Sequence, residues 1–123
     1  MSRDPAGARR RAARLPIEVP GSLSGRSPRP VSLVDLSLTG CLVRCDSLLD
    51  QGAILDLRTE LEGEPFAAKV RVTGSSVDGT APADARCLAG LEFLSLPALE
   101  EARLRRFVER ERQRRRSARP APE

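Results

Sequence analysis

The chain has 123 residues, which is enough for one domain with a modest core and too few for a two-domain enzyme. It has no histidine, which excludes Ser-His and Cys-His nucleophile pairs and HExxH zinc sites, and only three aromatic residues that could stack on nucleic-acid bases. The net charge of +4 is unevenly spread, because both ends are rich in arginine while residues 15–94 carry seven basic and eleven acidic groups. This composition argues against an enzyme, and we expect no cofactor.

Apolar and polar residues alternate with a period of two along most of the chain, which predicts six strands after a flexible lead-in. The alternation is clearest over 55–61. Pro20 in the first strand indicates an edge strand or a bulge, because proline cannot donate a backbone hydrogen bond. The stretch SSVDGTAPADA, residues 75–85, is predicted to be an exposed loop. In chain order, the lead-in and the six strands are expected at residues 1–8, 17–23, 31–37, 41–45, 55–61, 66–73 and 86–94.

A helical period appears only after the last predicted strand. Ser95 can cap this helix and Pro97 fits its first turn. Its apolar stripe consists of Leu99, Leu104, Phe107 and Val108. Beyond Val108 the sequence has no apolar face, so we expect one or two further helical turns in solvent. Residues 111–123 are expected to form an Arg-rich, disordered tail.

Six short strands separated by turn signals favour an antiparallel barrel over a parallel sheet, whose crossovers would need helices that the pattern does not predict. The predicted fold class is all-β, a six-stranded antiparallel β-barrel with a C-terminal α-helix, formed by residues 9–110. Cys41, Cys45 and Cys87 lack CxxC spacing, and we interpret them as small buried hydrophobic residues rather than metal or redox ligands.

The sequence contains no run of 18 apolar residues, so a transmembrane helix is not supported. Its first residues also lack the apolar segment of a secretory signal. We therefore expect a cytoplasmic protein.

Two short motifs are not required by such a barrel. The stretch RRRAAR lies just before the first strand and places Arg10 and Arg14 four residues apart. Two arginines at this spacing can close around an anion with charge-assisted hydrogen bonds, although a solvated basic tail has the same composition. The stretch DLSLTG places Asp35 and Ser37 on one face of a strand end. This arrangement fits either a binding site or a turn in which both side chains satisfy local backbone donors.

Together the two motifs resemble those of the PilZ family, small bacterial β-barrels that bind cyclic di-GMP. The family pattern is RxxxR before the first strand and, roughly twenty residues later, (D/N)xSxxG at the junction of the second and third strands. Both motifs are complete here, with twenty residues between Arg14 and Asp35. The stretches QGAILDLRTEL and GLEFLSLP are also similar to the family's fourth strand and to its last strand leading into the helix. The resemblance spans about residues 9–110.

The resemblance implies that cyclic di-GMP is bound by Arg10, Arg14, Asp35, Ser37 and Gly40. The two arginines would hold the phosphates and stack on guanine, while Asp35 and Ser37 would bind the polar edge of a guanine. Gly40 would form the turn that brings these groups together, where a glycine tolerates a positive φ. Arg9 and Arg11 are auxiliary candidates that either assist or only add charge.

The function implied by the resemblance is that of a cyclic di-GMP receptor or adaptor acting on an unidentified downstream protein. Its signal would be transmitted by ligand-induced ordering of the N-terminal Arg segment. One alternative is a PilZ-like protein-interaction module that does not bind nucleotide. Another is a nucleic-acid-binding protein that uses the two basic ends, but the acidic body and the scarcity of aromatic residues argue against nucleic acid.

Overall fold

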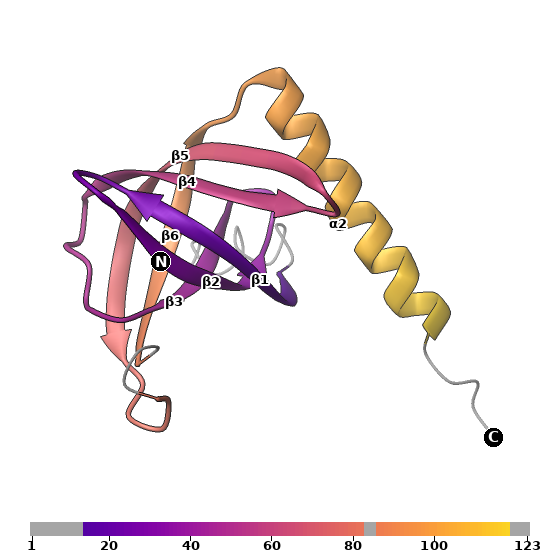
Figure 1. Cartoon of the computed structure of the whole chain (residues 1–123). Coiled ribbons are helices and arrows are strands. Elements are labelled where there is room, and N and C mark those ends of the chain that lie inside the picture. Colours follow the sequence, from indigo (N-terminus) through magenta and orange to yellow (C-terminus); the bar gives the residue numbers. More distant parts are fainter. Residues whose placement is uncertain (1–13, 83–85, 119–123) are drawn as a thin grey trace, which may run out of the picture.

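The computed structural model describes residues 14–82 and 86–118 (Figure 1). Within these residues the chain forms β1 (Leu15–Ser24), β2 (Pro28–Leu36), β3 (Gly40–Cys45), β4 (Ile54–Leu61), β5 (Glu64–Val77), β6 (Cys87–Ser95) and α2 (Ala98–Ala118). The strands close into an antiparallel barrel in the order β1-β2-β3-β6-β5-β4. The predicted fold class, an all-β six-stranded barrel with a C-terminal helix, is confirmed.

Barrel closure corrects the expectation for Pro20. β1 pairs with β2 on one side and with β4 on the other, so Pro20 does not mark an edge strand. A bulge was the other option, and the pairing of β1 with β2 does shift register between Pro16 and Val19. The pairing of β1 with β4 covers Gly21 to Ser24, and Pro20 lies just before it.

The barrel interior is filled by the side chains that the alternation places on one face of each strand. On β4, Leu57 and Leu61 are buried while Arg58 and Glu60 are exposed. Each fully buried Leu, Val or Phe side chain contributes about 1.5–3 kcal/mol relative to exposure. The three cysteines are buried and free, which confirms that they are part of the core.

The predicted loop over 75–85 is wrong at its start. β5 continues through Val77 and pairs there with β6. Ser75, whose polarity favoured a loop, has a structural role in the strand. Its Oγ donates to the carbonyl oxygen of Leu49 at 3.0 Å and accepts from the N–H of Leu49 at 3.1 Å, tying the loop between β3 and β4 to β5.

The helix α2 packs against β1, β4 and β5, and its C-terminal end projects away from the strands (Figure 1). Leu104, Phe107 and Val108 are buried, as predicted from their spacing. Leu99 is 57% exposed and does not belong to the buried stripe. This helix, the one that the described residues contain, is not long and apolar enough to cross a membrane.

The start of α2 also differs from the prediction. Ser95 is the last residue of β6 rather than a helix cap, and the helix begins at Ala98. Its first turn is fixed by a polar contact, because Glu100 accepts a hydrogen bond from the N–H of Ala67 on β5 at 3.1 Å. This contact explains why the first turn needs no buried leucine.

The C-terminal half of α2 is held to the barrel by arginines. Glu62, in the turn between β4 and β5, accepts a hydrogen bond from Arg114 at 2.5 Å, and Arg115 donates to the carbonyl oxygen of Pro16. Residues 111–118 are helical. The further helical turns expected beyond Val108 are therefore present, and the helix runs past residue 111, where the sequence places the start of the tail.

Glu62 makes the stability of the barrel depend on pH. Hydrogen bonds from Arg114 and Arg110 hold the pKa of Glu62 below its ordinary value of 4.5. A carboxyl whose pKa is lowered by folding stabilises the folded state above its ordinary pKa, and this contribution is lost as pH falls through the folded pKa. We therefore expect the melting temperature to fall less steeply below about pH 4.5 in Glu62→Gln than in the unchanged protein. Glu60→Gln, on the exposed face of β4, is the control and should keep the steep fall.

The barrel has two ends with different surroundings. We call one the helix end, which comprises residues 14–16, residues 36–40 and α2. The opposite one, the loop end, comprises the turn between β1 and β2 and the loop between β3 and β4, residues 24–29 and 46–54. A strand of the length of β2 separates the two ends by roughly 25–30 Å.

Candidate functional site

The two motifs singled out in the sequence meet at the helix end. The pairing of β1 with β2 sets Pro16 opposite Asp35, so Arg14, just before β1, reaches the end of β2. Nη1 of Arg14 donates to Oδ2 of Asp35 at 3.1 Å. Oδ1 of Asp35 is buried and has no hydrogen-bond partner among the described residues. Because an unsatisfied buried acceptor costs free energy, this oxygen is suited to receive an N–H group of a ligand.

Ser37 builds the turn that follows β2. Its Oγ accepts hydrogen bonds from the N–H groups of Thr39 and Gly40, both at 3.2 Å. The backbone N–H of Ser37 also donates to the carbonyl oxygen of Gly40 at 2.9 Å. The side chain is only 4% exposed, and these contacts occupy the acceptor sites of its hydroxyl group. In this structure Ser37 is therefore engaged in the local turn, which was the alternative left open by the sequence.

Replacing Ser37 by alanine is expected to destabilise the fold. The N–H groups of Thr39 and Gly40 would lose their acceptor, which should lower the free energy of unfolding by about 1–3 kcal/mol in a urea titration. Ser76→Ala is the control, because Ser76 is exposed on β5 and should change stability by less than about 0.5 kcal/mol. Equal effects of the two substitutions would contradict the structural role of Ser37.

Gly40 is required for a different reason than the one expected from the sequence. Its φ is not positive, since the positive-φ glycines of the described residues are Gly52 and Gly63. Gly40 instead pairs with Glu92 of β6, and a Cβ atom at Gly40 would lie 2.2 Å from the carbonyl oxygen of Leu91. The glycine therefore permits β3 and β6 to approach closely below the turn.

A groove of about 440 Å³ runs beside this turn. It is lined by Arg14, Ser37, Thr39, Gly40, Cys41, Thr73, Gly90, Leu91 and Glu92. The two sequence motifs include neither Glu92 nor Thr73. These residues reach the groove through the pairing of β3 and β5 with β6, which no local pattern in the sequence specifies.

The charged residues that line the groove are Arg14 and Glu92, and Asp35 is bonded to Arg14. Arg14 is about half exposed, whereas the side chain of Asp35 is 17% exposed. Burial and the neighbouring carboxylate of Asp35 raise the pKa of the Cys41 thiol to about 12. This thiol therefore stays protonated at neutral pH, in agreement with its prediction as a hydrophobic residue. Arg9, Arg10 and Arg11 lie outside the described residues.

The groove thus offers a guanidinium fork and glycine backbone, and the carboxylate of Asp35 is bonded to Arg14 beside it. A guanidinium can pair with a phosphate or stack on a base, and a carboxylate accepts hydrogen bonds from N–H groups. This combination suits an anionic ligand that also carries N–H donors. In the part of the chain that the structure describes, no three His, Cys, Asp or Glu side chains are grouped to hold a metal ion.

Comparisons with known proteins give a family and a set of similar folds. A family model described as the PilZ domain matches residues 8–110. No protein with curated annotation matches the chain significantly. The PilZ domain with c-di-GMP of YcgR from Escherichia coli has a TM-score of 0.69 and 20% sequence identity, with 89% of this chain and 97% of that chain covered.

Two longer solved chains are also similar. YcgR from Escherichia coli in complex with c-di-GMP has a TM-score of 0.71 and 21% identity, with 89% of this chain and 49% of that chain covered. The inhibitor of motility MotI/DgrA from Bacillus subtilis has a TM-score of 0.70 and 17% identity, with 94% and 54% covered. The present chain thus spans about half the length of these two proteins. At such identities the similarity concerns the fold.

Proposed function

Because this chain belongs to the PilZ domain family, we propose that it is a receptor for cyclic di-GMP. PilZ domains are binding and adaptor modules rather than enzymes. Two solved structures with this fold were determined with c-di-GMP, both of YcgR from Escherichia coli. The proposed ligand is anionic and carries guanine N–H donors, which are the properties suited to the groove at the helix end.

The observation that carries this proposal is the geometry of Asp35. One carboxylate oxygen is held by Arg14, and the other is buried without a donor among the residues that the structure describes. The guanine edge presents adjacent N1–H and N2–H groups, and one of them would satisfy the unpartnered Oδ1. The ion pair with Arg14 orients the carboxylate, so a ligand would meet a fixed acceptor.

Arg14 can serve the ligand without leaving Asp35. A guanidinium has five N–H donors, and the hydrogen bond to Asp35 uses one of them. The remaining donors can bind a phosphate oxygen, and the planar group can stack on a guanine face. We propose that Arg10 contributes a second guanidinium, with Arg9 and Arg11 as auxiliary residues. Gly40 and Ser37 would contribute through the shape of the turn.

We propose that cyclic di-GMP orders the N-terminal Arg segment, residues 9–14, across the helix end, and that the rearranged surface acts on a protein partner in the bacterial cytoplasm. The arginine spacing and the position of Arg14 beside the groove support this view. Hydrogen exchange should slow in residues 9–14 when the nucleotide is added. Unchanged exchange in a protein that binds the nucleotide would contradict this output mechanism.

Isothermal titration calorimetry of the full chain with cyclic di-GMP tests the receptor proposal. Cyclic di-AMP is the control ligand, because it has the same phosphates while its adenine lacks the N1–H donor that Asp35 would accept. We expect saturable binding of cyclic di-GMP and weaker binding of cyclic di-AMP.

A further inference from the structure

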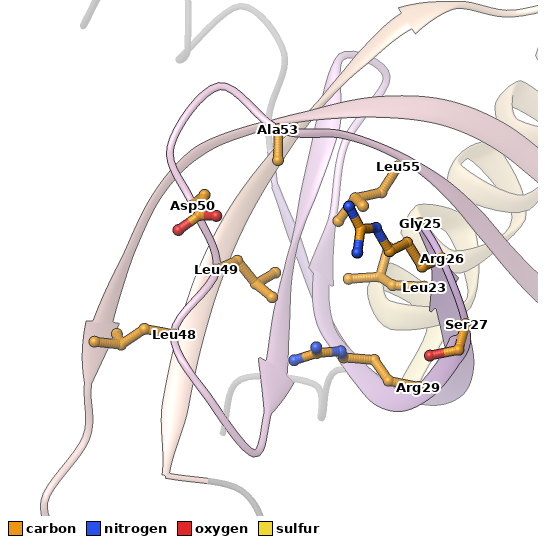
Figure 2. Close-up of a pocket in the computed structure, with 10 residues that line it drawn as sticks. All are labelled: Leu23, Gly25, Arg26, Ser27, Arg29, Leu48, Leu49, Asp50, Ala53 and Leu55. Atoms are coloured by element: carbon orange, nitrogen blue, oxygen red, sulfur yellow. The ribbon is translucent and has the colours of Figure 1, made fainter.

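The loop end of the barrel carries a second groove, on the opposite side of the molecule from Arg14 and Asp35. Its volume is about 380 Å³. Figure 2 shows the residues that line it, which are Leu23, Gly25, Arg26, Ser27, Arg29, Leu48, Leu49, Asp50, Ala53 and Leu55. The groove thus lies between the turn that connects β1 with β2 and the loop that connects β3 with β4.

Five of the ten residues that line the groove are apolar, namely Leu23, Leu48, Leu49, Ala53 and Leu55. Leu23 is buried, and Leu49 and Leu55 pack against the core while still lining the groove. Leu48, at the rim, is 56% exposed. Ile54 and Val77, at the adjacent strand ends, are 53% and 59% exposed. Of the four exposed large hydrophobic residues among the described ones, three therefore lie at the loop end, as is typical of interaction sites.

Two arginines, Arg26 in the turn and Arg29 at the start of β2, give this groove a positive edge. Figure 2 shows the guanidinium groups of Arg26 and Arg29 on two sides of the groove. Arg29 is fixed, because it donates to Oγ of Ser47 at 2.7 Å and lies 3.7 Å from the carboxylate of Asp46. Arg26 is exposed and forms no hydrogen bond or ion pair with the described residues. Its donors are available to a partner, and Asp50 is the one acidic residue that lines the groove.

We propose that the loop end is a docking surface for a protein segment that carries Asp or Glu next to Leu, Ile or Phe. The apolar side chain of the partner would fill the space between Leu23, Leu49 and Leu55, and its carboxylate would pair with Arg26. Arginines beside well-packed apolar residues are common centres of binding energy in protein interfaces. The charge complementarity selects an acidic rather than a basic segment.

The assignment of this surface to the downstream partner rests on the proposed receptor function. Its binding is nevertheless measurable without nucleotide. The distance between the two ends, roughly 25–30 Å, lets a peptide and a nucleotide bind without steric conflict. The Arg14→Ala variant should accordingly bind a peptide as the unchanged protein does, which separates failure of this inference from failure of the receptor proposal.

A phage-displayed library of random 12-residue peptides, selected on the full chain without nucleotide, tests the inference. We expect the selected peptides to be enriched in Asp or Glu close to Leu, Ile or Phe. For a synthesised peptide, fluorescence anisotropy should show at least about 10-fold weaker binding to Arg26→Glu. Leu48→Ser should weaken binding about 3- to 10-fold.

Two matched controls separate local from general effects. Arg116→Glu makes the same charge change on exposed α2, and Leu99→Ser removes a leucine that is 57% exposed at the helix end. Both should bind within about 2-fold of the unchanged protein, since neither residue lies at the loop end. Selected peptides without acidic enrichment, or equal binding to Arg26→Glu, would overturn the inference. Self-association of the chain that Leu48→Ser abolishes would overturn it as well, because a second copy would then be the occupant.

Discussion

The Gly40→Ala variant is expected to lose more than about 3 kcal/mol of its free energy of unfolding. The added Cβ would lie 2.2 Å from the carbonyl oxygen of Leu91, 3.2 Å from its carbonyl carbon and 3.3 Å from Cα of Glu92. These are backbone atoms of a paired strand and cannot rotate away, so β3 and β6 must separate. For a domain of this size, the melting temperature should fall by more than about 12 °C.

The chain provides a matched control for this substitution. Gly74 lies on β5, its φ is not positive, and a Cβ there would meet no atom within 4 Å. Gly74→Ala should leave the melting temperature unchanged or raise it slightly, because alanine restricts the unfolded chain. A similar stability of the Gly40 and Gly74 variants would contradict the close approach of β3 and β6. If Gly40→Ala still folds, the displaced strands should also reduce nucleotide binding.

The Arg14→Ala variant is expected to bind cyclic di-GMP about 10- to 100-fold more weakly than the unchanged protein. The substitution removes the donors for a phosphate and the partner that orients Asp35. Arg14→Lys retains the charge but loses the planar fork, so its affinity should lie between those of Arg14→Ala and the unchanged protein. Asp35→Asn should also weaken binding by about 10-fold or more, because its amide cannot replace a carboxylate that accepts at both oxygens.

These losses of affinity can be separated from losses of stability. The Arg14 side chain is 52% exposed, and an ion pair of this kind contributes at most about 1 kcal/mol to folding. Arg14→Ala should therefore melt close to the unchanged protein while binding the nucleotide poorly. Arg58→Ala, at an exposed position of β4, is the control for the loss of an arginine and should bind normally. Equal affinities of the Arg14 and Arg58 variants would show that the site is assigned to the wrong residues.

Much of the fold could be predicted because its strands are half buried. Leu57 and Leu61 alternate with charged residues, and this local pattern is enough to define β4. Features that depend on distant partners were not predictable in this way. Ser75 lies in β5, where it contacts the loop at Leu49, and α2 runs as far as Ala118, with Arg114 bonded to Glu62.

The candidate site, like the fold, could be predicted from the sequence only in part. The two motifs predicted that Arg14 and Asp35 belong together, and their 3.1 Å contact is consistent with that prediction. The hydroxyl of Ser37 is used in the turn, and the constraint on Gly40 is steric rather than a positive φ. The contacts of Ser37 lie within the turn itself, whereas the constraint on Gly40 exists only after β3 has paired with β6. For the same reason, the position of Glu92 beside the groove could not be read from its own strand.

The central claim is that the helix end binds cyclic di-GMP, and a calorimetric titration of the unchanged chain with this nucleotide tests it most directly. We predict saturable binding with a dissociation constant below about 30 μM and clearly weaker binding of cyclic di-AMP. The absence of binding at tens of micromolar, or equal affinity for the two nucleotides, would contradict the assignment of Asp35 and Arg14 to a guanine-nucleotide site.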